Sequence, residues 1–168
     1  MNAPVSYLFV PGNRPERFNK ALSSGADVVI IDLEDAVPDA DKSYARDETR
    51  HWLEWHGAQR SGMPESGRII VRINAAGSAH IDDDLALLRN APPAGVMLAK
   101  AESAMQIERV ANGIDPEGKK LPFIIPLVES ALGVLERQSR VGSFFSSPLV
   151  VGGTVYIGAA DGRVYALE

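Results

Sequence analysis

The chain has 168 residues, of which 45% are hydrophobic and 23% are charged, and it contains no cysteine. This composition is typical of a globular protein with a sizeable core. The net charge of −5 gives no basic field for nucleic acid or an anionic membrane. No apolar run approaches the ~20 residues of a membrane span. No disulfide framework is possible without cysteine, and no signal-peptide pattern opens the chain, so we expect a cytoplasmic protein.

Short apolar segments alternate with amphipathic segments over about the first 140 residues. Strands are expected at 7–10, 28–31, 68–74, 94–98 and 121–128, and helices at about 14–24, 38–56, 82–90, 103–112 and 131–140. About five strand–helix units with short loops predict a parallel sheet with right-handed crossovers. No strand leads into a Gly-x-Gly-x-x-Gly or Walker-type loop, which disfavours a nucleotide-binding sheet.

Polar residues recur where the expected strands end. Asp32, Glu34 and Asp35 follow the second strand, and the later strands are followed by Arg72, Asn74, Lys100, Glu102 and Glu129. The carboxyl ends of parallel strands meet at one edge, where an α/β enzyme places hard-metal or acid–base chemistry. This convergence favours a (β/α) barrel over an open doubly wound sheet. Lys100 and Glu102 also fit a surface pair.

These residues have structural interpretations as well. Asp35 could cap the following helix. Glu129 could lie at a helix N-terminus, where a carboxylate favours the helix dipole. Arg72, inside an apolar strand, could be a buried ion-pair partner of Glu34 or Asp35. From the residues alone, both interpretations stay open.

The pattern changes after about residue 140. Short apolar segments at 148–151, 154–157 and 164–167, with an Asp-Gly turn at 161–162, predict an antiparallel β-meander or hairpin. A complete barrel needs eight strand–helix units and ~200 or more residues. The expected fold is therefore α/β, with an incomplete TIM barrel over residues 1–140 and a β-hairpin tail over residues 141–168.

Several motifs occur in a distinctive order. They are SYLFVPGNRP at 6–15, GADVVIIDLEDAVP at 25–38, VRIN at 71–74, MLAK at 97–100 and PLVESALG at 126–133. Over about residues 6–136 the chain resembles the citrate lyase beta-subunit and CoA-ester lyase family. The resemblance implies a Mg²⁺-dependent TIM-barrel lyase that cleaves a 3-hydroxyacyl-CoA, or forms it from an acyl-CoA and a 2-keto acid. It also implies a homo-oligomer.

The resemblance implies roles for individual residues. Glu129 matches one of the family's two direct Mg²⁺ ligands. Arg72 matches the group that holds the keto-acid oxygens and the developing enolate. Glu34 and Asp35 match an acidic pair that positions metal-bound water. The remaining matches are two cations, Arg14 and Lys20, which lie where the family contacts substrate or CoA phosphates.

The chain also departs from the family. The second Mg²⁺ ligand, an aspartate in a Phe-Gly-x-x-Asp-Leu type motif after the sixth strand, has no counterpart here. In its place, residues 146–167 resemble one repeat of a PQQ-type β-propeller. The chain therefore looks like part of a lyase barrel joined to a propeller-repeat fragment, through a natural fusion, a truncated reading frame or a deliberate chimera. Turnover by this form is therefore an open question. The alternative is a non-catalytic, self-associating barrel fragment, because five units leave open strand edges. A propeller-type binding module would need further repeats.

Overall fold

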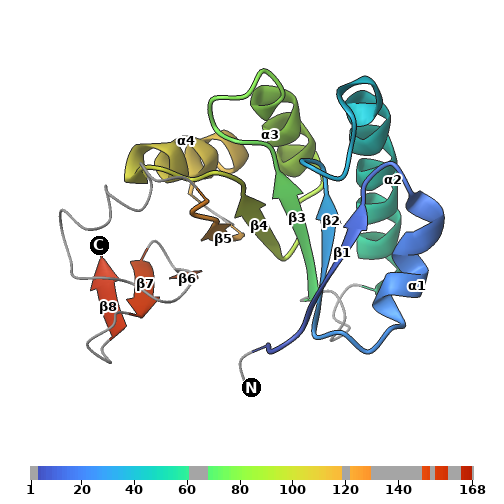
Figure 1. The fold of residues 1–168 in the computed structure, drawn as a ribbon, viewed down its shortest axis with the longest axis horizontal. Coiled ribbons are helices and arrows are strands. Elements are labelled where there is room, and N and C mark those ends of the chain that lie inside the picture. Colours follow the sequence, from blue (N-terminus) through green and yellow to red (C-terminus); the bar gives the residue numbers. More distant parts are fainter. Residues whose placement is uncertain are drawn as a thin grey trace.

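The computed structural model describes residues 4–60, 68–118 and 122–129, together with the backbone of three strands between 149 and 167. Five parallel strands form one sheet whose spatial order follows the chain (Figure 1). They are β1 (Tyr7–Pro11), β2 (Val28–Asp32), β3 (Ile69–Ile73), β4 (Gly95–Leu98) and β5 (Phe123–Pro126). A doubly wound sheet reverses its strand order at a switch point, whereas this sheet runs in one direction. The order therefore confirms the barrel-like α/β arrangement.

Helices follow the first four strands. They are η1 (Pro15–Arg17) with α1 (Phe18–Leu22), η2 (Asp39–Asp41) with α2 (Lys42–Arg60), α3 (Ile81–Asn90) and α4 (Ala104–Ile114). Ser103 caps α4 by accepting a hydrogen bond from the Gln106 N–H. The expected helix at 131–140 lies outside the described residues. Among the described helices, none combines the length and apolar character needed to cross a bilayer.

Alternate strand residues face two separate apolar clusters. The larger cluster joins one face of the sheet to the helices and includes Val29, Ile31 and Val71. The smaller cluster lies on the opposite face and consists of Val28, Ile30, Ile70, Met97 and Ile125. Successive side chains of a strand point to opposite faces, so a strand buried on both faces must be apolar throughout. This requirement explains the unbroken VVII run of β2.

The C-terminal strands form a second sheet. Strands β6 (Leu149–Val151), β7 (Thr154–Gly158) and β8 (Val164–Leu167) pair antiparallel in the order β6-β7-β8. This order confirms the expected antiparallel meander. The Asp-Gly turn at 161–162 lies outside the described residues, and the division of the chain at residue 140 stays a prediction.

Gly12 lies where β1 ends, against the end of β2. Its N–H donates to the Asp32 carbonyl at 2.8 Å. A Cβ at this position would lie 2.8 Å from Leu33 Cδ2 and 3.0 Å from the Asp32 carbonyl oxygen. Leu33 is buried, so the packing has little room to adjust.

We therefore expect Gly12→Ala to lower the free energy of unfolding by about 1–3 kcal/mol, measured by urea denaturation. Gly77→Ala is the matched control, since no atom lies within 4 Å of a Cβ added there. That variant should stay within about 1 kcal/mol of the wild type. Equal losses in the two variants would contradict the steric explanation.

Candidate active site

A bidentate ion pair joins β2 to β3 at their carboxyl ends. The Arg72 Nε donates to Asp32 Oδ1 at 2.7 Å, and Nη2 donates to Oδ2 at 2.6 Å. The two residues are direct partners in the register of the strands. Hydrogen bonding to Asp32 raises the pKa of Arg72, and the guanidinium also lies 4.9 Å from the centre of the Phe9 ring. Sequence reasoning expected Arg72 to pair with Glu34 or Asp35. The ion pair with Glu34 is present, with Arg72 Nη1 3.6 Å from Glu34 Oε2, whereas the closer bidentate pairing with Asp32 was not foreseen.

Asp32 also shapes the loop that follows β2. Its carboxylate accepts the N–H of Glu34 at 2.9 Å and the N–H of Ala36 at 3.1 Å. Only 1% of Asp32 is exposed, and a buried carboxylate is tolerated when its oxygens are hydrogen-bonded and paired with a cation. Asp32 therefore sets both the orientation of Arg72 and the backbone that presents Glu34.

Glu34 and Asp35 lie together but differ in environment. Glu34 is buried, and its Oε1 accepts from the Lys100 Nζ at 2.6 Å. Its Oε2 accepts the Asp35 N–H at 2.9 Å and lies 3.6 Å from Arg72 Nη1. The Asp35 side chain is exposed, with Oδ1 3.6 Å from Lys100 Nζ. Hydrogen bonding with Glu34 and the charges of Lys100 and Arg72 hold the pKa of Asp35 below its usual range.

Lys100, which follows β4, connects the cluster to Glu129, which follows β5. Its ammonium binds Glu34 and approaches Asp35, and its main-chain N–H donates to Glu129 Oε2 at 3.1 Å. The hydrogen bond to Glu34, with the charges of both carboxylates, raises the pKa of Lys100. Sequence reasoning left Lys100 open as one member of a surface pair. Its contacts favour the site interpretation.

Two buried side chains hold the main chain at the exit of β2. Lys42 donates from Nζ to the carbonyls of Leu33 at 2.9 Å and Glu34 at 3.0 Å. Asn74, at the exit of β3, donates from Nδ2 to the same Leu33 carbonyl at 3.0 Å. Neither role is visible in the sequence, although Asn74 belongs to the predicted row of polar residues after the strands.

Asp84 completes this buried support. Its Oδ2 accepts the Asn74 N–H at 3.0 Å and the Asn74 Nδ2 at 2.7 Å, while Oδ1 accepts from Arg46 at 3.2 Å. The side chain is fully buried, and this burial raises the pKa of Asp84 above its usual value. The network ties the N-terminal turn of α3 to the strand ends.

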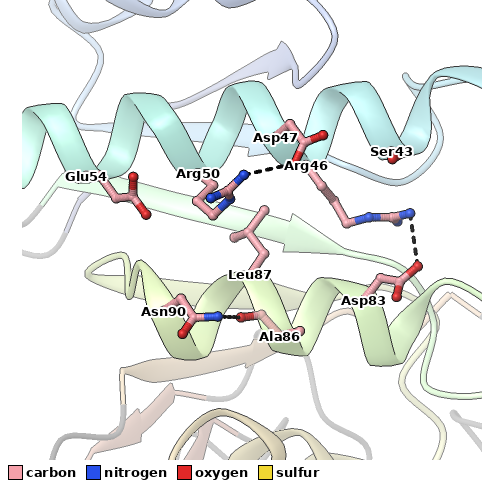
Figure 2. A pocket seen from close by; sticks show the side chains of 9 residues that line it. All are labelled: Ser43, Arg46, Asp47, Arg50, Glu54, Asp83, Ala86, Leu87 and Asn90. Atoms are coloured by element: carbon pink, nitrogen blue, oxygen red, sulfur yellow. Dashed lines mark hydrogen bonds and ion pairs between the residues drawn. The ribbon is translucent and has the colours of Figure 1, made fainter.

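A cleft of about 460 Å³ opens beside this cluster. The loops that follow β2 and β3 line it, and Glu34, Asn74, His80 and Lys100 are among its walls. A larger hollow of about 690 Å³ lies between α2 and α3 and contains none of the predicted site residues (Figure 2). Its arginines are already paired, Arg46 with Asp83 and Arg50 with Asp47. The cleft at the strand ends is the better candidate site, because the predicted site residues Glu34 and Asp35 line it together with Lys100.

The predicted site residues fall into two groups. The structure brings Glu34, Asp35, Arg72 and Glu129 together, through contacts with Lys100 or with one another. The other two, Arg14 after β1 and Lys20 on α1, are exposed. Within the described residues, neither side chain is joined to this cluster. The chemical roles of all six residues stay predictions.

The donor atoms suit Mg²⁺, which prefers carboxylate oxygens and keeps several water ligands. Glu129 is exposed and binds Lys100 through one oxygen only. Across the described ranges, no three His, Cys, Asp or Glu side chains gather closely enough to hold a metal by themselves. The cluster thus fits a site in which Glu129 is one direct ligand and water supplies others.

Comparison with known proteins agrees with this arrangement. The family model described as HpcH/HpaI aldolase/citrate lyase matches residues 5–161. The chain belongs to this family. The match runs beyond residue 136, where we expected the family resemblance to end, and into the tail.

Individual members of the HpcH/HpaI family are similar over most of this chain. The citrate lyase subunit beta-like protein of Mycobacterium tuberculosis is 42% identical over 133 residues, which is 79% of this chain and 41% of that protein. The mitochondrial citramalyl-CoA lyase of Rattus norvegicus is 30% identical, over 93% of this chain and 50% of the relative. A crystal structure of Mycobacterium tuberculosis CitE in complex with magnesium, acetoacetate and coenzyme A has a TM-score of 0.61 at 39% identity, over 80% of this chain and 43% of that one. This chain therefore spans about half the length of the curated relatives that it matches.

Removing one partner of the Asp32–Arg72 pair should be strongly destabilising. We expect Arg72→Met to lower the free energy of unfolding by about 3–5 kcal/mol, because it leaves the buried Asp32 carboxylate without its cation. Urea denaturation measures the loss. Arg50→Met is the control, since it removes a more exposed pair with Asp47 and should cost about 0–1 kcal/mol. A loss below that of the control would contradict the buried-pair assignment.

Asp84 should give the stability a recognisable pH dependence. Burial raises the pKa of Asp84 in the folded protein, so protonation of this carboxyl favours the folded state. This contribution to the free energy of unfolding is fully present below the pKa of the unfolded chain, and it is lost as the pH rises through the pKa of the folded protein. The stability of Asp84→Asn relative to wild type should therefore increase upward from the ordinary aspartate pKa of about 3.9 and then level off. Urea denaturation at several pH values measures this difference. Asp83→Asn, which removes the exposed partner of the same arginine, is the control, and a pH-independent difference for Asp84→Asn would contradict the assignment.

Proposed function

We propose that this chain provides the strand-end half of a Mg²⁺-dependent carbon–carbon lyase site, which acts on a 3-hydroxyacyl-CoA. The observation that supports this proposal is the meeting of Glu34, Arg72, Lys100 and Glu129 at the carboxyl ends of β2 to β5. Membership of the aldolase/citrate lyase family supports the reaction class. The magnesium and coenzyme A bound by a similar protein support the cofactor and the thioester.

The reaction requires a place for negative charge. In the cleavage direction the 3-hydroxyl group loses its proton and becomes the carbonyl of a keto acid. The bond between C2 and C3 breaks, its electron pair forms the enolate of the acyl-CoA, and a proton then adds to C2. A bound Mg²⁺ ion supplies Lewis-acid stabilisation of such oxygens, and fixed cations add to it.

Arg72 is suited to this electrostatic task. Asp32 fixes two of its nitrogens, while Nη1 faces the carboxylate of Glu34 at 3.6 Å. A guanidinium held in this way needs little reorganisation when charge develops on the substrate, which is the condition for strong electrostatic stabilisation. We assign Arg72 to the keto-acid oxygens and the developing enolate.

The acidic residues have different proposed roles at the metal ion. Glu129 would hold the metal ion directly, and Glu34 and Asp35 would orient water around it. Arg14 and Lys20 would contact the substrate or the CoA phosphates. Their exposure is compatible with this role, and Arg14 follows β1 at the same sheet edge as the cluster.

A non-catalytic, self-associating barrel fragment is the second candidate. Strand β1 has β2 as its one neighbour in the described sheet. Its apolar side chains Tyr7, Leu8 and Phe9 are 46%, 37% and 45% exposed. An exposed apolar edge strand favours pairing with another chain, so a homo-oligomer remains part of both proposals.

The chimera and the cytoplasmic location stay predictions, as does the propeller resemblance of residues 146–167. The antiparallel order of β6, β7 and β8 is compatible with part of one propeller blade. The family match, in contrast, extends to residue 161. A single repeat cannot form a propeller, so we assign the tail no binding function.

Calorimetric titration of Mg²⁺, with and without oxaloacetate as the probe keto acid, tests the proposal. We expect saturable binding that oxaloacetate tightens and that Glu129→Gln weakens about 10-fold or more. Glu108→Gln, at an exposed position on α4, is the matched control and should bind as the wild type does. No heat of binding in any titration would contradict the metal site and favour the second candidate.

A further inference from the structure

Lys100 has an unusual backbone conformation. Its φ is +50°, and it is the one residue other than glycine with positive φ in the described part of the chain. In this region the Cβ of an L-residue crowds the backbone, so side chains other than those of Asn, Asp and His are rarely found there. Such strain persists where the surroundings fix the conformation, and it is concentrated at functional sites.

The residues on either side of Lys100 are fixed by the sheet. The Ala99 N–H donates to the Ile73 carbonyl of β3 at 3.3 Å, and the Ala101 N–H donates to the Leu127 carbonyl beyond β5 at 2.7 Å. Both alanines are buried. The backbone of residue 100 must therefore redirect the chain, so that the N–H before it faces β3 and the N–H after it faces the end of β5.

This turn gives Lys100 contacts in two directions. Its N–H is bound to Glu129, 29 positions later in the chain, while its Nζ is bound to Glu34, 66 positions earlier. An exposed lysine that formed only a surface ion pair would need no left-handed backbone. A surface ion pair alone therefore does not explain why Lys100 combines a left-handed backbone with these two contacts.

We propose that Lys100 is a positioning residue. Its left-handed backbone directs the main-chain N–H at Glu129, and its ammonium holds Glu34, so that one residue sets the spacing between these two carboxylates. The metal-related part of this inference rests on the proposed function, in which Glu129 binds Mg²⁺. The positioning itself concerns contacts that exist without the metal.

Two substitutions separate the backbone from the ammonium. Lys100→Asn and Lys100→Val both remove the positive charge and have side chains of similar size. Asn tolerates positive φ, whereas the β-branched Val does not. We expect calorimetry to give a Mg²⁺ dissociation constant for Lys100→Val at least about 10-fold weaker than for Lys100→Asn, in the range found when groups that orient metal ligands are lost. Equal constants would overturn the backbone role.

A measurement without metal keeps the inference testable if the wild type binds no Mg²⁺ or if Lys100→Val does not fold. The ¹H–¹⁵N resonance of the Lys100 amide should move upfield in Glu129→Ala, because the N–H loses its carboxylate acceptor. The same substitution in a Lys100→Asn background should produce the same shift. An unchanged Lys100 resonance in Glu129→Ala would overturn the inference, whereas absence of Mg²⁺ binding with the shift present would overturn the proposed function alone.

Discussion

The buried ion pair between Asp32 and Arg72 is the interaction on which the strand ends depend. It crosses from β2 to β3 with two short hydrogen bonds, and Asp32 uses its carboxylate again to hold the N–H groups of Glu34 and Ala36. A carboxylate that is 99% removed from solvent has a large desolvation penalty unless all of its acceptor positions are used. The partners that fill these acceptor positions fix three features together: the register of β2 against β3, the plane of the Arg72 guanidinium and the path of the loop after β2.

Much of this arrangement follows from patterns in the sequence. The alternation of apolar and amphipathic segments predicted the parallel strands, because strands buried on both faces must be apolar throughout. The row of polar residues after the strands predicted the edge at which Glu34, Arg72 and Glu129 meet, since parallel strands place their carboxyl ends together. These are consequences of local periodicity and of topology, and both can be derived from a single chain.

The pairing within the cluster was not predictable in the same way. Sequence reasoning named Glu34 or Asp35 as the ion-pair partner of Arg72 and missed Asp32, because the bidentate pairing depends on the register of β2 against β3. It also left Lys100 undecided, since a contact across 66 positions and a positive φ have no periodic signal. Lys42 and Asn74 were missed as supports because both bind main-chain carbonyls, which every residue possesses.

The charges of the cluster connect this architecture to the proposed chemistry. The cluster contains four carboxylates: Asp32, Glu34, Asp35 and Glu129. Arg72 and Lys100 contact these carboxylates, and a third cation, Lys42, binds main-chain carbonyls beside them, so the formal charge is −4 + 3 = −1. Bound Mg²⁺ would change this to +1, which favours an anionic keto acid and an enolate over the neutral enol. Without Lys100 the formal charge would be −4 + 2 = −2, and bound Mg²⁺ would bring it only to 0. On this basis the lysine that we propose spaces the carboxylates also supplies the net positive charge by which the metal-loaded site would attract an anionic substrate.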